Sequence, residues 1–351
     1  MPGEPAATRT SSAIAIRRGT RGTVTGLGLS MCVIVFLIFA PLFAGSGFVY
    51  DVTQLSILIV MAVSWNLLAG YGGMISIGQQ GYIGLGSFAV LGLSLNGVLA
   101  WYAVPIAIVI VGVISLPVSY LAFRLRGGYF AIGTWVIASV FEILISQNKS
   151  LGAGSGLVLT DLNNVSPVLR NHVVYWFALG IGVITLVTTA FLLRSRVGLA
   201  LMAVRDGEIA ARATGVNIER TKRIVYVLAA AMGAGAGALL ILSNLEAQPA
   251  ASFNVQYTAY MIFMVVVGGM GTFEGPIIGA ILFFVLQQSL DSYGAWYLVL
   301  LGATAVAAAI WLPRGIWGLV DPEHHRSLVP LRHRVSIKDG RVGEADTLAG
   351  R

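Results

Sequence analysis

Long apolar runs recur along this chain and limit what it can fold into. They begin near residue 25 and end near residue 312, and most are close to 20 residues long. An apolar helix of about 20 residues is long enough to cross the hydrocarbon layer of a membrane. Only 11% of the residues are charged, against roughly one quarter in soluble domains. We therefore predict an all-α polytopic integral membrane protein.

The predicted membrane spans number about ten. They lie at about 25–48, 53–69, 82–99, 103–123, 129–147, 173–193, 224–243, 258–270, 276–290 and 295–312. The eighth and ninth are shorter than a full span and are joined by GGMGTFEGP, so eight spans with a re-entrant hairpin are the alternative. The transmembrane domain then covers 25–313, between polar tails at 1–24 and 314–351.

A polar break at 194–223 separates two of these runs. It contains seven Lys or Arg residues and three acids. Basic residues also gather in the N-terminal tail, at 124–126 and beyond residue 313. An excess of basic residues in short loops marks the cytoplasmic side. We therefore expect both termini and the 194–223 loop to be cytoplasmic, and the net charge of +7 reflects topology rather than nucleic-acid binding.

The break contains residues that typically begin and end a short helix. Asp206 is predicted to cap its N-terminus, Glu208 to lie in the first turn, and Gly215 to end it in the left-handed conformation. An isolated helix this short is marginal in water. An ordinary amphipathic loop helix is one interpretation, and a helix on which a partner docks is the other.

The same residues resemble a known signature. EIAARATGV, with Ala210 and Ala211 between Glu208 and Gly215, resembles the EAA loop of ABC importer permeases, and RVGLALMAVRDGEIAARATGVNIERTK is similar to the version in branched-chain amino acid ABC permeases of the LivM type. The resemblance implies that this segment, Asp206 included, is a coupling helix that sits in a groove of a cytoplasmic ATPase subunit.

Glycine-rich interruptions occur in both halves of the chain. LLAGYGGMISIGQQGYIGLGSF covers 67–88, and GGMGTFEGP lies between the eighth and ninth runs. Paired interruptions of this kind predict broken helices and a binding site near the midplane of the membrane. The first run, LRGGYFAIGTWVIA and YMIFMVVVGGMGTFEGPIIGAIL all resemble LivM-type permeases, although many relatives have His where this chain has Gln79.

A few polar residues lie within predicted spans. Those suited to hydrogen-bonding a small zwitterion or amide are Ser76, Gln79, Gln80, Tyr129, Thr134 and Ser139. Glu142 is the carboxylate placed well inside a span, where an ionisable group suggests function. Its position would equally let it reach the outer interface. Individually, such polar residues more often join helices to one another.

Small residues are spaced for close helix packing. Ala229, Gly233 and Gly237 lie four apart with Gly235 between the glycines, and Gly271, Gly275 and Gly279 repeat the interval. Small residues at this spacing let helix backbones approach closely in lipid. We predict a tightly packed bundle, with a second membrane subunit as a possible neighbour.

Other classes fit less well. A membrane-embedded enzyme needs clustered catalytic or metal-ligating groups, yet all four histidines lie outside the predicted spans and the single cysteine, Cys32, forms no Cys site. No metal site is predicted. The sequence has no GxxxxGK[ST] motif, so the chain is not expected to be an ATPase. An ion-coupled secondary transporter is the alternative of a different class, with Glu142 as its ion-site candidate.

The resemblance implies the permease subunit of an ABC importer in the cell inner membrane, moving branched-chain or other neutral amino acids, with urea or short amides as the alternative. It further implies four kinds of neighbour: a homologous second permease, cytoplasmic ATPases that bind ATP and Mg²⁺, an extracytoplasmic binding protein, and membrane lipid.

Overall fold

The computed structural model describes residues 13–17, 21–162, 165–290, 296–312, 314–320 and 334–338. Much of both predicted tails, including His324, His325 and His333, lies outside these ranges. The long helices are α1 (Arg21–Phe39), α2 (Ser46–Asn66), α3 (Gln80–Leu95), α4 (Ala100–Ala122), α5 (Gly128–Ser146), α6 (Pro167–Arg194), α9 (Ile218–Asn244), α11 (Gln256–Gly268), α12 (Gly275–Leu290) and α13 (Trp296–Trp311). Shorter ones are α7 (Arg196–Asp206), α8 (Glu208–Ala213), α10 (Pro249–Ser252) and α14 (Gly315–Val320).

Each predicted span falls on a helix. Within the described residues, six helical stretches are long and apolar enough to cross a membrane: Ser46–Tyr71, Ala100–Ala122, Gly128–Ser146, Pro167–Arg194, Ile218–Asn244 and Pro249–Gly268. Four shorter apolar stretches, at Ser30–Leu42, Gln80–Leu95, Gly275–Leu290 and Val299–Ala308, account for the remaining predicted spans. The multi-pass helical fold is thus confirmed, while the number of complete crossings stays a prediction.

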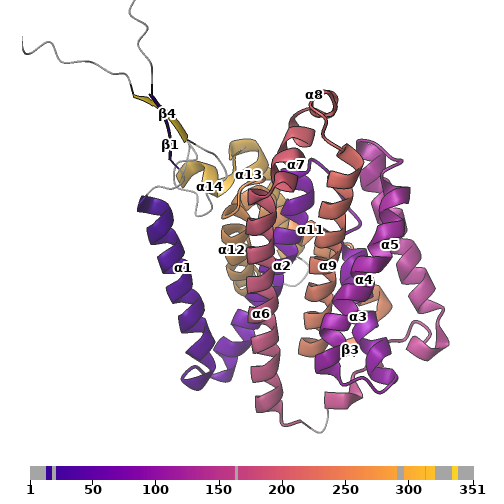
Figure 1. Ribbon diagram of the computed structural model, residues 1–351. Coiled ribbons are helices and arrows are strands. Elements are labelled where there is room, and N and C mark those ends of the chain that lie inside the picture. Colours follow the sequence, from indigo (N-terminus) through magenta and orange to yellow (C-terminus); the bar gives the residue numbers. More distant parts are fainter. Residues whose placement is uncertain are drawn as a thin grey trace, which may run out of the picture.

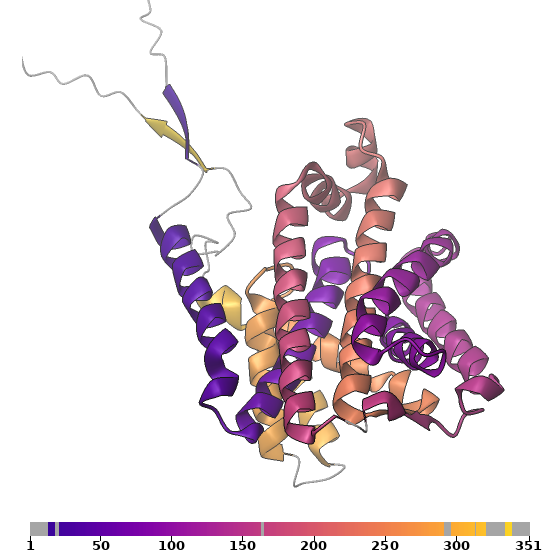
Figure 2. The same ribbon diagram turned by 60° about the horizontal axis from the view of Figure 1, so that its bottom comes forward.

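Helices α2 and α9 form the centre of the bundle. In the most apolar part of each, 72% of the residues are buried, against 17% in α5. Helix α9 packs on α3, α4 and α2. Figures 1 and 2 place α1 at one edge of the bundle and α5 at the opposite edge. A helix rich in Gly and Ala can occupy the centre because its small side chains admit neighbours on every side.

The connections divide between the two ends of the bundle. Helices α7, α8 and α14 lie at one end, together with the strand β1 (Ala13–Arg17), while β2 (Leu157–Val158) and β3 (Glu246–Ala247) lie at the other (Figure 1). We call these the loop end and the far end. The basic 194–223 break and the first and last described segments therefore share one end, as the charge pattern requires.

The prediction of an all-α chain is confirmed, and two short strand pairs accompany the helices. β1 pairs antiparallel with β4 (Arg334–Lys338), with Ala13 opposite Lys338. β2 pairs antiparallel with β3, with Leu157 opposite Ala247. The β2–β3 pair packs on the far end of the bundle, where Ala247 is buried against α3 and α9.

The small residues predicted to bring helices close together do so to different degrees. A Cβ built on Gly237 would lie 1.8 Å from the backbone O of Ile83 on α3, and one on Gly279 would lie 1.8 Å from the O of Met264 on α11. At Gly235 the nearest atom is the flexible Cγ2 of Ile181, at 3.1 Å, and at Gly233 it is the Cβ of Tyr82, at 3.4 Å. Gly275 also has a backbone atom close to a built Cβ, the O of Gly269 at 2.4 Å, so close backbone contact occurs at Gly237, Gly275 and Gly279.

Candidate functional site

The polar break folds into two helices rather than one. Helix α7 follows α6 directly, and the Ser195 hydroxyl caps it by accepting a hydrogen bond from the N–H of Val197 at 3.2 Å. Its buried side chains include Leu201 and Val204. The sequence-based prediction placed a single short helix in this break. It assigned the residues of α7 to a polar loop and overlooked their apolar positions.

The predicted cap at Asp206 is wrong. Asp206 is the last residue of α7, and the residue that caps α8 is Gly207, without a side-chain hydrogen bond. Aspartate before glycine can end one helix as readily as begin another, because the glycine provides the break. The prediction for Gly215 is confirmed, since it follows α8 with φ +82°, a conformation in which glycine is favoured.

Helix α8 has a buried and an exposed side. Ala211 is 2% exposed and packs with Val204 and Ile218, which fastens α8 to α7 and α9. Ile209 is 90% exposed. Helix α8 therefore packs on the bundle through Ala211 and presents Ile209 to solvent.

An ion pair joins α8 to the central helix. The ammonium group of Lys222 on α9 donates to the Oε1 of Glu208. The lysine side chain is 19% exposed and the glutamate side chain is 50% exposed. The counter-charge of Glu208 is thus supplied within this chain.

The first glycine-rich stretch breaks a helix, as predicted. Helix α2 passes into a π-helical turn, η2 (Leu67–Tyr71), and the next helix begins at Gln80. Trp65 supports the non-helical segment by donating its indole N–H to the O of Ser76 at 2.9 Å. Gly78 lets the backbone of α5 approach closely, because any side chain at this position would place its Cβ 1.9 Å from the O of Thr134. Single π-helical turns inside helices are frequent at functional sites.

The two breaks meet. The Asn66 side chain accepts a hydrogen bond from the N–H of Gly271 at 2.9 Å and donates one to the O of Thr272 at 2.8 Å. Asn66 precedes the first break, and both partners lie in the second, between α11 and α12. A buried amide that satisfies backbone groups on a second segment fixes the two segments together.

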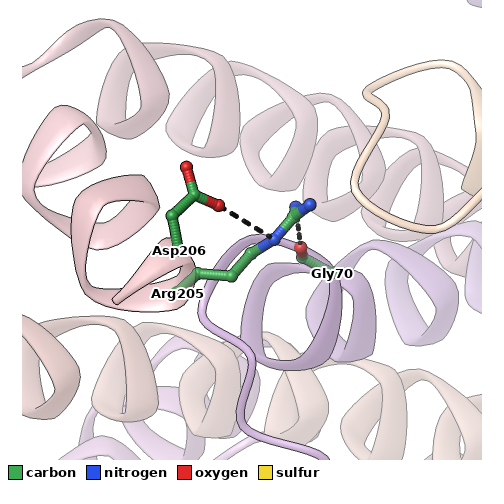
Figure 3. A network of polar contacts seen from close by, with 3 residues as sticks. All are labelled: Gly70, Arg205 and Asp206. Carbon is green, nitrogen blue, oxygen red and sulfur yellow. Dashed lines mark hydrogen bonds and ion pairs between the residues drawn. The ribbon is translucent and has the colours of Figure 1, made fainter. Parts of the chain in front are cut away.

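Arg205 ties this junction to the loop. From the last turn of α7, its Nη1 donates to the O of Gly70 at 2.6 Å, while its Nε lies 3.9 Å from the carboxylate of Asp206 (Figure 3). The junction therefore adjoins the loop end of the bundle. The binding site predicted near the membrane midplane stays a prediction.

Four of the predicted pathway residues come together. Ser76, Gln79, Gln80 and Thr134 are each at most 2% exposed. Gln79 donates to the O of Ala229 at 3.0 Å, and its Oε1 is buried without a hydrogen-bond partner among the described residues. The hydroxyl of Thr258, which the sequence analysis did not single out, donates to the Oε1 of Gln80.

The remaining candidates lie elsewhere on α5. Tyr129 is 77% exposed and does not join the buried cluster. Glu142 and Ser139 are partly exposed, and Glu142 lies one turn before the end of α5 at Ser146. The structure thus does not bring Glu142 together with the polar residues around Gln79.

A cavity at the far end of the bundle was missed. It has a volume of about 550 Å³ and is lined from α2, α9, α10, α11 and α12. Its polar lining residues are Tyr50, Asp51, Gln54, Asn244, Asn254, Gln256, Tyr257, Tyr260, Gln287 and Gln288. A second cavity of about 200 Å³ shares Leu240, Asn244, Ala251 and Tyr257 with it. The repeated Asn and Gln residues near helix ends are the sequence feature that could have indicated this cavity.

These features define a multi-pass membrane protein whose helix breaks meet beside a projecting loop helix, an arrangement suited to a transport subunit. A family model described as "Branched-chain amino acid transport system / permease component" matches residues 48–309. The chain belongs to this family of ABC transporter permeases, and the resemblance noted in the sequence is confirmed.

Characterised relatives agree with this assignment. The chain is 26% identical to the high-affinity branched-chain amino acid transport system permease protein LivM of Escherichia coli, over 84% of this chain and 75% of that protein. It is 24% identical to LivH of Salmonella typhimurium over 78% of this chain and 94% of that protein. The ribose import permease protein RbsC of Escherichia coli matches 38% of this chain at 26% identity.

Proposed function

We propose that this chain is the transmembrane subunit of an ATP-driven importer of branched-chain or other neutral amino acids in the inner membrane. A homologous permease, cytoplasmic ATPases that bind ATP and Mg²⁺, and an extracytoplasmic binding protein complete the transporter. The names of the LivM and LivH relatives support the substrate class. Urea or short amides remain the alternative substrates.

The observation that carries the proposal is the bonded path from α8 to the helix breaks. Glu208 on α8 pairs with Lys222 on α9, and Arg205 on α7 bonds to Gly70 in the first break. Asn66 then joins that break to the second. Motion applied to α8 reaches α9 and both breaks through these contacts, because each is a direct polar bond between separate elements.

This arrangement gives a mechanism for alternating access. ATP binding closes the ATPase pair and shifts α7 and α8, with Ile209 seated in the ATPase. The shift displaces α9 and the junction at Asn66, and the bundle opens toward the opposite side. Helix breaks can change arrangement without loss of helical hydrogen bonds elsewhere, as broken helices of transporters do.

The test is a substitution at the exposed contact. Ile209→Asp should leave the abundance and melting temperature of the chain unchanged, since Ile209 is 90% exposed, yet it should abolish ATPase binding and ATP-dependent leucine uptake by the reconstituted complex. Ile209→Leu, which keeps an apolar side chain, is the matched control. Normal ATPase binding and uptake by the Ile209→Asp complex would overturn the proposed docking role of α8.

A further inference from the structure

We propose that the 550 Å³ cavity at the far end of the bundle is a substrate site for the zwitterionic form of an α-amino acid, with the Asp51 carboxylate as the counter-charge of its ammonium group. The inference rests on the proposed function and adds to it the site and the chemical class of ligand. The cavity volume lies in the usual range of about 300–1,000 Å³ for small-molecule sites.

The charges of the lining select the ligand. Among the lining residues that the structure describes, Asp51 is the only charged one. It makes no ion pair or hydrogen bond with any described residue, whereas Asp161, an acid at the same end, accepts a hydrogen bond from Ser94. A lining with one negative charge and no positive charge repels anions and attracts a ligand that carries an ammonium group.

The other lining residues divide by chemistry. Amides and tyrosines supply hydrogen-bond donors suited to a carboxylate, among them Gln287, Gln288 and Tyr257. Ile57, Met61 and Phe284 supply apolar surface in the same cavity. An α-amino acid with an apolar side chain satisfies the acid, the amides and the apolar wall together, while urea leaves both the Asp51 charge and the apolar wall without a match.

The position fits an entrance for substrate. Asn244 is the last residue of α9, which begins at Ile218 beside α8. At about 1.5 Å per residue, this helix holds the cavity roughly 40 Å from the loop end. A site at this distance faces the side from which a binding protein would deliver its ligand.

The charge of the cavity can be tested without knowing the ligand. In a Cys32→Ala background of the complete complex, Gln288→Cys introduces a thiol on the cavity wall, and Ser155→Cys is the control at the same end outside the cavity. Cationic and anionic methanethiosulfonate reagents are then compared. We expect the cationic-to-anionic rate ratio at position 288 to exceed that at 155 by about tenfold, as one unit charge a few ångströms away produces in a partly solvated cavity.

Asp51→Asn should lower the cationic-to-anionic rate ratio at position 288 to the ratio measured at position 155. Leucine should slow the labelling at position 288 only while Asp51 is present. A ratio that Asp51→Asn does not change would overturn the inference.

A transport assay distinguishes failure of this inference from failure of the proposed function. With the reconstituted complex and its binding protein, Asp51→Asn should raise the KM for leucine about two- to fivefold, the effect of losing a partly solvated charge pair, while Asp161→Asn leaves it unchanged. If the unmodified complex takes up leucine and Asp51→Asn does so with the same KM, the cavity assignment fails and the proposed function stands. If the unmodified complex takes up neither leucine nor any other neutral amino acid, the proposed function fails, and the labelling ratio still decides whether Asp51 sets the charge of the cavity.

Discussion

Lys222 of α9 donates to the carboxylate of Glu208 on α8, so the projecting loop helix is held to the most central helix of the bundle by a charge pair. The pair is partly exposed, and such pairs contribute about 0–1 kcal/mol to stability. Its importance would lie in transmission rather than in folding, because α8 has few other polar contacts with the bundle.

The first prediction tests this pair. Glu208→Lys should leave membrane insertion and abundance near normal but uncouple ATP hydrolysis from uptake, since two like charges would separate α8 from α9. The measurement is ATP-dependent uptake beside ATP hydrolysis in proteoliposomes. The exchange Glu208→Lys with Lys222→Glu restores the pair and should recover part of the coupling, and failure of any recovery would argue that Glu208 acts on the partner instead.

A second prediction concerns Arg205. Replacement by Gln should remove the bond to the O of Gly70, which is 2.6 Å long. A hydrogen bond from a charged group contributes about 1.5–3 kcal/mol. We expect the melting temperature in detergent to fall and uptake per ATP hydrolysed to drop several-fold. Asp206→Asn is the control, because that side chain is 78% exposed. Equal effects of the two changes would contradict a special role for Arg205.

Local features of the sequence were sufficient to place the helices and the breaks. A span or a glycine-rich interruption is a property of neighbouring residues, and each predicted run lies on a helix. The contacts between the breaks could not be predicted in the same way. Arg205 and Gly70 are 135 positions apart and Asn66 and Gly271 are 205 apart, so no local pattern pairs them.

The cavity was missed for a related reason. Asp51 precedes the predicted second span, and the other polar lining residues outside α2 come from α9, α11, α12 and the segment between α10 and α11. Tyr129 shows the opposite error. A tyrosine within an apolar run predicts a polar contact, but only the rotation of α5 in the bundle determines that this side chain is 77% exposed.

The third prediction concerns topology. Thr10, Ala211 and Gly340 are predicted to be cytoplasmic, but Thr10 and Gly340 lie outside the described residues and Ala211 is buried. Ile209→Cys is the better probe at the loop end, and Ser155→Cys reports the far end. In a Cys32→Ala background, a membrane-impermeant maleimide should label position 155 in intact cells and position 209 only after permeabilisation. Labelling of position 209 in intact cells would invert the membrane orientation.

The last prediction tests which glycines hold the helices together. A Cβ on Gly237 would lie 1.8 Å from the O of Ile83, and a backbone atom cannot move aside as a side chain can. Overpacking of this kind costs about 1–3 kcal/mol, which outweighs the roughly 0.5–1 kcal/mol that alanine gains over glycine inside a helix. Gly237→Ala should therefore lower the melting temperature in detergent and the yield of assembled complex.

Two other glycines serve as controls for the effect of Gly237→Ala. Gly180 on α6 has no heavy atom within 4 Å of a built Cβ, so Gly180→Ala should be neutral or slightly stabilising. Gly235 faces only isoleucine side chains, so Gly235→Ala should fall between the two, and the larger Gly235→Leu should reduce the yield of complex because those side chains cannot yield enough space. If Gly237→Ala proved as harmless as Gly180→Ala, helices α3 and α9 would not be in backbone contact, and the rigid centre required for transmission from α8 would be absent.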